Sequence, residues 1–466
     1  IRMALKLRNV IRGSNKLHNS FPLGWLEELL PTFPMRGENI EVLFSPSKFY
    51  EKLRTNITEA KYRITWASLY LGNGDLENLL VKSLNSKLAD SNVEVKILLD
   101  YTRGSRGEIN SRTQLLPLLN YSSKCQVAFF HSPYLRGIQK RILPDRWNEI
   151  VSLQHMKIYI FDDNVICSGA NLSSDYFVNR QDRYIVIKNS DLSDYLNQVI
   201  ATLMKISLQL NPDNEVLLHK DWDISPIHGD YNQYIEKSKE LLYSCLSPPN
   251  PYQSAPSDCD TWINPLFQMP CFDVRKDEEV TSKLLSSNMR LKLATGYFNL
   301  TDKYTSLLVE KQRLPADILT AHPTCNGFLG ASGLSGYIPS MYVTLTQHFL
   351  NILAKHKLSH LVKMYEFRRE GWTYHGKGLW LYPEEGNFPF LTLIGSPNFG
   401  YRSVFRDMEL QLLLVTSNES LGQQLSEEYS MLFQYGSAVT ERVLTDPHHQ
   451  VPYWVNFLSH YIKKYF

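Results

Sequence analysis

The feature that most constrains the fold of this 466-residue chain is an internal duplication. A histidine and a lysine two residues apart occur in the first half of the chain, and the same pair returns in the second half, each time in a strand-like run. The four residues are His155, Lys157, His375 and Lys377. Side chains two residues apart on a strand point to the same face, so each pair presents an imidazole beside a cation.

The residues that follow each pair repeat as well. Ser168-Gly-Ala-Asn171 comes after the first pair and Gly395-Ser396-Pro-Asn398 after the second. An acid then stands eleven residues beyond each asparagine, at Asp182 and at Glu409. A recurrence of this length favours a shared chemical role over two unrelated core histidines.

Hydrophobic alternation predicts strands in both halves, with helical patterns between them, such as 76–84 and 342–356. The predicted strands are 61–71, 93–99 and 153–161 in the first half, and 290–297, 316–320, 361–368 and 373–381 in the second. Strands that alternate with helices predict an α/β fold. We therefore expect two pseudo-symmetric α/β domains, each a mixed sheet flanked by helices.

The chain is long enough for two domains, and a Pro/Ser-rich stretch at 246–258 reads as a linker or exposed loop between them. The first 26 residues hold basic but no acidic side chains, which favours the remnant of a mitochondrial presequence or, alternatively, a basic surface arm. The predicted divisions are a basic N-terminal segment 1–35, a first domain 36–245, a linker 246–260 and a second domain 261–466.

Bulk composition excludes several classes of protein. The chain is 43% hydrophobic and 21% charged, which is typical of a globular protein, and its formal net charge of +2 argues against a nucleic-acid partner. No run of 18 apolar residues predicts a membrane-spanning helix. The six cysteines form no CxxC pair, so neither a disulfide framework nor a metal site is expected, and a reducing compartment fits best.

An imidazole next to a fixed cation suits phosphoryl chemistry, and a carboxylate can hold the second ring nitrogen of a histidine. Asp182 and Glu409 are the candidates for that carboxylate, and Asn171, Asn398 and Ser396 for phosphate ligands. Asp162 lies five residues after Lys157 and joins the candidate set. A structural role near the strand end, paired with a lysine or a backbone group, is the favoured interpretation for Asp162.

The doubled HxK pattern, each copy followed by a glycine-containing turn that ends in asparagine, resembles the phospholipase D superfamily. The segments that begin at Asp100 (DYTRGSRG) and His131 (HSPYLRG), together with LQHMK, GANLSSDYFVNRQDRY, HGKGLWLY and IGSPNFGYRS, are similar to the phosphatidylglycerophosphate synthase family within it. The similarity runs from about residue 41 to 435. It departs at Tyr382, where an aspartate is expected, and at Gly169, which stands where the second turn has Ser396.

The resemblance implies that the two halves share one active site at their interface. One histidine attacks phosphorus and the other protonates the leaving group; we assign His155 as nucleophile and His375 as general acid and then base, with the reverse polarity left open. The implied substrates are CDP-diacylglycerol and glycerol 3-phosphate, and the products are phosphatidylglycerophosphate, a cardiolipin precursor, and CMP. No cofactor or metal is implied, and the expected location is mitochondrial, at the inner membrane.

The phosphate of the acceptor needs a cationic site. Arg103, Arg106 and Arg112 follow a predicted strand, where α/β proteins place binding loops, although solvated surface arginines explain them equally well.

A lipid substrate requires contact with a membrane surface. Apolar and aromatic residues recur at helical spacing from Trp454 to Tyr465, next to Lys463 and Lys464, which favours an interfacial amphipathic helix or a helix packed on the core. A hydrolase of lipid or nucleic acid and a non-catalytic lipid-binding scaffold remain as alternatives. Retention of both HxK pairs argues against the scaffold.

Overall fold

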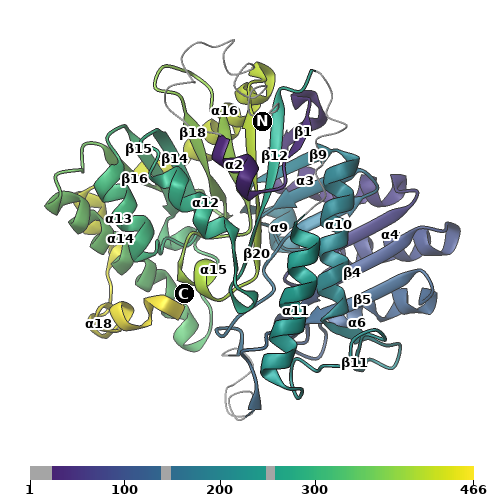
Figure 1. Cartoon of the computed structure of the whole chain (residues 1–466). Helices are drawn as coiled ribbons and strands as arrows, with labels where there is room; N and C mark the ends of the chain where they lie inside the picture. Colours follow the sequence, from purple (N-terminus) through teal and green to yellow (C-terminus); the bar gives the residue numbers. More distant parts are fainter. Residues whose placement is uncertain (1–23, 138–147, 248–257, 466) are drawn as a thin grey trace.

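The computed structural model describes residues 24–137, 148–247 and 258–465, and two large sheets dominate it (Figure 1). The first half forms a nine-stranded sheet in the order β11-β10-β5-β4-β3-β6-β7-β9-β2. Its strands are β2 (Ile40–Leu43), β3 (Arg63–Ala67), β4 (Glu94–Asp100), β5 (Cys125–Phe130), β6 (Ile158–Phe161), β7 (Asn164–Ser168), β9 (Tyr184–Lys188), β10 (Leu208–Leu210) and β11 (Val216–Leu218). The pairs β3–β4 and β4–β5 are parallel, and the other neighbours are antiparallel.

The second half forms a ten-stranded sheet in the order β1-β12-β20-β19-β18-β14-β15-β16-β21, with β13 (Val274–Arg275) paired to β12. The strands are β1 (Phe33–Met35), β12 (Thr261–Met269), β14 (Arg290–Thr295), β15 (Ala316–Ala321), β16 (Val362–Phe367), β18 (Lys377–Tyr382), β19 (Leu391–Gly395), β20 (Glu409–Thr416) and β21 (Gly436–Ala438). Here β14, β15 and β16 are parallel, as β3, β4 and β5 are in the first sheet. The order β16-β15-β14-β18-β19-β20-β12 repeats β5-β4-β3-β6-β7-β9-β2, so the two halves share one topology, as the sequence predicts.

Helices cover both sheets. The longer ones are α3 (Pro46–Glu59), α4 (Asp75–Asp90), α10 (Ser190–Lys205), α11 (Tyr231–Leu246), α12 (Lys276–Leu285), α13 (Asp302–Lys311), α14 (Ile338–Lys355), α16 (Glu419–Phe433) and α18 (Tyr453–Ile462). Local sequence sets their ends: α3 begins with Pro46 at its first turn, where Ser45 caps the Lys48 N–H, and its buried Phe49 and Leu53 lie one turn apart. No helix in the described ranges is long and apolar enough to cross a membrane.

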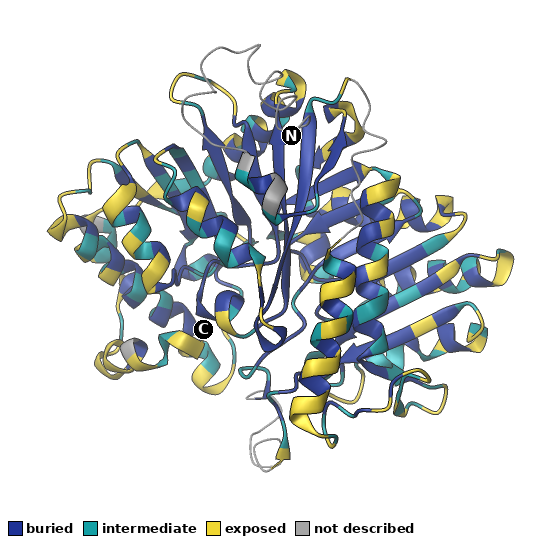
Figure 2. Ribbon diagram, in the orientation of Figure 1, coloured by how far each residue is buried: buried dark blue, intermediate teal, exposed yellow. Residues whose placement is uncertain are grey.

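The two sheets are joined by a common core. Ile160 and Val165 of the first sheet belong to the same buried apolar cluster as Ile263 and Leu412 of the second, and β7 contacts β19 directly. Figure 2 shows this as buried strands at the centre of the molecule, with exposed residues on the outer faces of the helices. Two further clusters lie under the outer helices of each half. The halves therefore meet along a buried apolar interface.

The N-terminal part of the chain does not follow the predicted division. Strand β1 pairs antiparallel with β12, and Leu26 and Leu30 pack in the core of the second half, so residues 24–35 belong to the second sheet although they precede the first. The interpretation of 1–35 as one basic segment is therefore wrong for 24–35, because these residues are ordered by apolar contacts and strand pairing. Residues 1–23 and most of the predicted linker, 248–257, lie outside the described residues.

Candidate active site

His155 lies just before β6, in an extended segment that pairs with the other half of the molecule. Its N–H donates to the Met408 carbonyl at 2.8 Å, and the Met408 N–H donates to the Leu153 carbonyl at 2.8 Å. Gln154, which lies between Leu153 and His155, forms a parallel bridge with Met408. Its N–H donates to the buried Asp100 carboxylate at 2.9 Å, which further fixes the position of this segment. The predicted strand 153–161 is thus shorter, and its first residues cross to the second half instead.

The ring of His155 is held by an acid from the second half. Its Nδ1 lies 2.9 Å from Oε2 of Glu409, the first residue of β20, while Oε1 of Glu409 accepts a hydrogen bond from Ser403 at 2.8 Å. Burial lowers the pKa of His155, and Lys157 adds to this effect while Glu409 opposes it. Burial alone would raise the pKa of Glu409, but His155 and Lys157 bring it below its usual value. The carboxylate is therefore ionised and able to stabilise an imidazolium.

His375 has the mirror arrangement. It follows β17 (Thr373–Tyr374), which pairs parallel with β8 (Arg180–Gln181) of the first half, and its N–H donates to the Gln181 carbonyl at 2.8 Å. Its Nδ1 lies 2.6 Å from Oδ2 of Asp182, the acid of the first half. The predicted strand 373–381 is split here into β17 and β18, because its first residues pair with β8.

The two acids are therefore exchanged between the halves. Asp182 follows His155 in the sequence but binds His375, and Glu409 follows His375 but binds His155. In each case the backbone of the histidine segment pairs with the residues just before the acid, which fixes the ring and the carboxylate together. The sequence predicts the acids as histidine partners but leaves open which histidine each one serves. Neither half alone contains both members of a catalytic histidine–acid pair.

Two buried lysines complete the centre. Lys157 Nζ donates to the His155 carbonyl at 2.6 Å and Lys377 Nζ to the His375 carbonyl at 2.7 Å. Lys377 Nζ also lies 2.7 Å from Nδ1 of His375 and 3.6 Å from Oδ2 of Asp182. The pKa of Lys157 falls to about 7, chiefly because of burial; Lys377 contributes to this decrease, while Glu409 and Asp182 oppose it. The lysines of the two halves thus lie within electrostatic reach of each other.

His375 titrates far from its usual range. Burial lowers its pKa well below the usual value, and the positive charges of Lys377, Arg180 and Lys157 lower it further. The pKa of Asp182 rises to about 6 through burial, against the opposing charge of Lys377. Cations of both halves gather around these groups, and such a concentration of positive charge favours an anionic ligand such as a phosphate.

The turn residues border the same centre. Asn171 donates to the Tyr176 hydroxyl at 3.2 Å, and among the residues the structure describes, Oδ1 of Asn171 and Oδ1 of Asn398 are buried without a hydrogen-bond partner. The Ser396 hydroxyl lies 3.1 Å from both the carbonyl and the N–H of Leu410, next to Glu409. An unused amide oxygen can accept a hydrogen bond from a ligand hydroxyl, whereas a phosphate oxygen would be bound by the N–H groups of the same amides.

Gly169 accounts for one of the differences between the two turns. A Cβ at this position would lie 2.6 Å from Oδ1 of Asp182 and 2.9 Å from Nζ of Lys377. The first turn therefore has no room for the hydroxyl that Ser396 supplies in the second. Ser168 provides a related contact one residue earlier, since its hydroxyl donates to the Arg183 carbonyl at 2.6 Å.

Sequence reasoning missed two tyrosines and an arginine beside His375. The Tyr176 hydroxyl lies 3.2 Å from Nε2 of His375, and the rings of Tyr176 and Tyr297 contact the imidazole edge-on with centroids at 5.0 and 5.4 Å. Arg180 lies over the Tyr176 ring at 4.7 Å and donates to the Thr373 hydroxyl. Arg180 precedes Asp182 by two residues, so strand periodicity would have placed both on one face.

The three arginines predicted to bind the acceptor phosphate have different contacts in the structure. Arg103 follows β4 and lies 3.9 Å over the ring of Tyr70. Arg106 pairs with Glu149 at 2.6 Å, and Arg112 donates to the Asn214 carbonyl. The last two arginines therefore already have protein partners.

Asp162 has the structural place that was favoured for it. It lies at the far end of β6 from Lys157, and its carboxylate accepts the backbone N–H groups of Lys61, Tyr62 and Arg63 at 2.7–2.9 Å. Asp162 is therefore removed from the catalytic candidates, because its carboxylate anchors the turn after β6 to the start of β3.

The fold and the doubled histidine–lysine site define a protein of the phospholipase D type. Residues 53–204 match the family model described as "Cardiolipin synthase, PLD-like domain". The crystal structure of phosphatidylserine synthase from Haemophilus influenzae superposes with a TM-score of 0.73 at 19% identity, covering 94% of this chain and 98% of that one, which indicates a common fold.

Proteins of similar sequence identify the family within the phospholipase D type. Mitochondrial CDP-diacylglycerol–glycerol-3-phosphate 3-phosphatidyltransferases from Gallus gallus and Homo sapiens are 41% and 40% identical over 95% of this chain, covering 86% and 85% of their own lengths. The Saccharomyces cerevisiae enzyme is 32% identical over 91% of this chain and 88% of its own length. The chain belongs to the CDP-diacylglycerol–glycerol-3-phosphate 3-phosphatidyltransferase family.

Proposed function

We propose that this chain transfers the phosphatidyl group of CDP-diacylglycerol to glycerol 3-phosphate through a covalent phosphatidyl-histidine, with release of CMP. The observation that carries the proposal is the pair of exchanged histidine–acid contacts at the junction of the two halves. Two displacements at one phosphorus atom require a nucleophile and a separate acid–base group, and this junction supplies one of each.

In the first step Nε2 of His155 attacks the β-phosphorus of CDP-diacylglycerol, and the bond from that phosphorus to the oxygen of CMP breaks. The new phosphatidyl-imidazolium keeps its Nδ1 proton, which is hydrogen-bonded to Glu409. His375 gives its proton to the departing oxygen. Burial and the neighbouring cations lower the pKa of His375, but the negative charge of a bound diphosphate favours the protonated ring.

In the second step the now neutral His375 accepts a proton from a hydroxyl of glycerol 3-phosphate. The hydroxyl oxygen attacks phosphorus, the phosphorus–nitrogen bond breaks, and His155 returns to its neutral form. Lys157, Lys377 and the two turn asparagines, Asn171 and Asn398, stabilise the non-bridging oxygens in both steps. Their contribution arises from fixed charge and hydrogen bonding around phosphorus.

The assignment of His155 as nucleophile is supported by accessibility. The side chain of His155 is 12% exposed, whereas that of His375 is 4% exposed and its Nε2 lies against the Tyr176 hydroxyl. An attacking nitrogen must reach the substrate with its lone pair, while an acid–base group works by holding one proton near the reacting oxygen.

The phosphate of the acceptor is proposed to bind near Arg103, at the carboxyl end of β4. Arg106 and Arg112 belong to the same predicted cluster, but their contacts with Glu149 and Asn214 favour a supporting role. Arg103→Ala is expected to raise KM for glycerol 3-phosphate by about tenfold, in line with the loss of a charge-assisted hydrogen bond. An unchanged KM would remove Arg103 from the acceptor site.

We propose that α18 docks on the membrane with one face while its opposite face packs on the protein. Val455 and Ser459 are buried, and α18 lies against α14, whereas Phe457 and Tyr461 are 59% and 67% exposed. Aromatic side chains on one face of a helix suit the headgroup region of a bilayer. We propose the mitochondrial inner membrane as the location; the names of the relatives support the mitochondrial part of this proposal.

Vesicle sedimentation tests the docking face. Phe457→Ser combined with Tyr461→Ser is expected to weaken binding to anionic vesicles without a change in thermal unfolding. Tyr62→Ser is the matched control, since Tyr62 is 74% exposed in the first half. Equal binding by the paired variant and the control would exclude α18 as the docking helix.

An assay with labelled CDP-diacylglycerol, with and without glycerol 3-phosphate, tests the reaction. We expect CMP release to depend on the acceptor and labelled phosphatidylglycerophosphate to form in equal amount. Rapid CMP release without acceptor, with phosphatidate as product, would instead identify a hydrolase in which water reaches the intermediate.

A further inference from the structure

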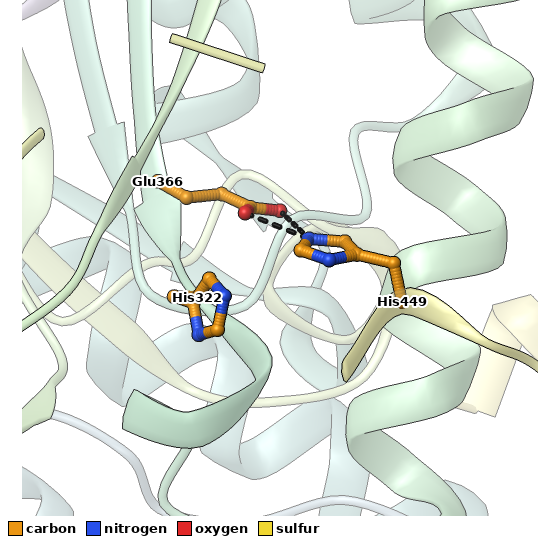
Figure 3. Close-up of side chains that lie close together, drawn as sticks. All are labelled: His322, Glu366 and His449. Atoms are coloured by element: carbon orange, nitrogen blue, oxygen red, sulfur yellow. Dashed lines mark hydrogen bonds and ion pairs between the residues drawn. The ribbon is translucent and has the colours of Figure 1, made fainter. Parts of the chain in front are cut away.

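A second cluster of titratable side chains lies outside the catalytic centre, in the second half. His322 follows β15, Glu366 is on β16, and His449 ends a short 3-10 turn (Pro447–His449) near the C-terminus. Figure 3 shows the three side chains converging from these separate segments. They are 4%, 3% and 2% exposed, so the cluster is buried within the protein. We propose that His322, Glu366 and His449 bind a dication of the Zn²⁺ type.

The geometry is that of a compact donor set. Each residue offers one ligand atom, and these atoms all lie within 4.8 Å of one another. His449 Nε2 lies 2.8 and 3.1 Å from the two oxygens of Glu366. Ligand atoms about 2 Å from a central Zn²⁺ are somewhat closer together than this limit, so small side-chain movements close the site.

One nitrogen of the cluster has no use without a ligand. Among the residues the structure describes, His449 Nδ1 is buried and lacks a hydrogen-bond partner. A buried polar atom left without a partner is unfavourable, so a ligand at this nitrogen would stabilise the fold. His322 differs, because its Nδ1 lies 2.7 Å from the Thr324 hydroxyl and 3.2 Å from the Thr324 N. Metal binding through Nε2 requires the tautomer in which Nδ1 carries the proton and donates it to that hydroxyl.

The donor types select the ion. Two imidazoles and one carboxylate are a common three-residue set for Zn²⁺, with the fourth position left to water. The single carboxylate leaves a net positive site when the ion is bound, and Ca²⁺ or Mg²⁺ would require more oxygen ligands than this cluster has. The ion would fasten the segment before α18 to the ends of β15 and β16, which is a structural role for the docking helix.

Metal binding to the whole chain tests the proposal. The purified protein is dialysed against a chelator and then titrated with Zn²⁺ or Co²⁺, with metal content measured by mass spectrometry and thermal unfolding by circular dichroism. We expect one equivalent per chain, a raised Tm, and the visible absorption of four- or five-coordinate Co²⁺.

Variants separate a metal site from a simple ion pair. Glu366→Gln, His449→Gln and His322→Asn should each weaken Zn²⁺ binding by more than about tenfold. His322→Asn keeps an acceptor for the Thr324 N–H, which guards against misfolding. His356→Gln, an exposed histidine at the end of α14, should bind as the unaltered chain does. Zn²⁺ binding that is absent from the unaltered chain, or equal in all folded variants, would overturn the proposal and leave a structural Glu366–His449 pair.

Discussion

The two half-sites follow one plan but enclose their histidines differently. His155 is the more exposed ring, and it pairs with Glu409, whose pKa lies below its usual value. His375 is almost fully buried between two tyrosine rings, and it pairs with Asp182, whose pKa burial raises to about 6. The copies have kept their backbone geometry while their electrostatic settings have diverged, which is what a reaction with one nucleophile and one acid–base group requires.

Removing each histidine gives the largest expected effect. His155→Ala and His375→Ala should each lower phosphatidyl transfer by about 10⁴-fold or more, because each takes part in both displacements. The two variants should differ in how much of the covalent intermediate accumulates. His375→Ala should accumulate labelled phosphatidyl on the protein, because CMP leaves more easily than the second step proceeds. His155→Ala should acquire no label. Quenched single-turnover labelling measures this difference. A label on His375 in the His155→Ala variant would reverse the assignment.

Replacing the exchanged acids, Glu409 and Asp182, should give the next largest loss of activity and tests directly how the two half-sites differ. Glu409→Gln should slow formation of the labelled intermediate, and Asp182→Asn should slow its transfer to the acceptor, each by about 10²–10⁴-fold. Separate rapid-mixing measurements of CMP release and product formation resolve the two steps. If Glu409→Gln impairs only the second step and Asp182→Asn only the first, each acid serves the histidine of its own half.

Much of this arrangement is predictable from the sequence, and the rest is not, for a physical reason. Hydrophobic alternation predicts the central strands of both sheets, and the repeated HxK and Asn–acid spacing marks the candidate polar groups. That the two halves share one centre is implied by the resemblance to the phospholipase D superfamily. The exchange of acids depends on backbone pairing between residues far apart in the chain, Gln154 with Met408 and Tyr374 with Gln181, and spacing along one half carries no signal of it. Strand β1 has only three residues, too few for a period-2 pattern.

The turns offer an intermediate test of how far the copies have diverged. Gly169→Ser, which copies the second half into the first, should lower activity by about tenfold to a hundredfold, because the new Cβ would meet Asp182 and Lys377. Ser396→Gly, the reciprocal change, removes both hydrogen bonds between the Ser396 hydroxyl and Leu410 and should cost about 1–2 kcal/mol of unfolding free energy with a smaller loss of activity. Steady-state assays and thermal unfolding compare them. Full activity in Gly169→Ser would show that the first turn can accommodate a serine side chain.

The pH profile gives the smallest effect. Burial lowers the pKa of Lys157 to about 7, so the free enzyme holds this charge below pH 7 and loses it above. We expect kcat/KM to fall about tenfold per pH unit on the alkaline side, and the kcat limb to lie at higher pH because bound phosphate favours the charged lysine. Lys157→Arg should move the kcat/KM limb upward, while Lys363→Arg, an exposed control, should not. If the alkaline limb of kcat/KM is unchanged in Lys157→Arg, that limb reports the titration of another group.

The most direct test of a single centre shared by both halves is a crystal structure with orthovanadate, which mimics the five-coordinate phosphorus of a displacement. The account predicts one vanadium atom per chain, bonded to Nε2 of His155, with an opposite oxygen within hydrogen-bond distance of Nε2 of His375. Two vanadate ions, one in each half, or a single ion held by the residues of one half alone, would contradict it.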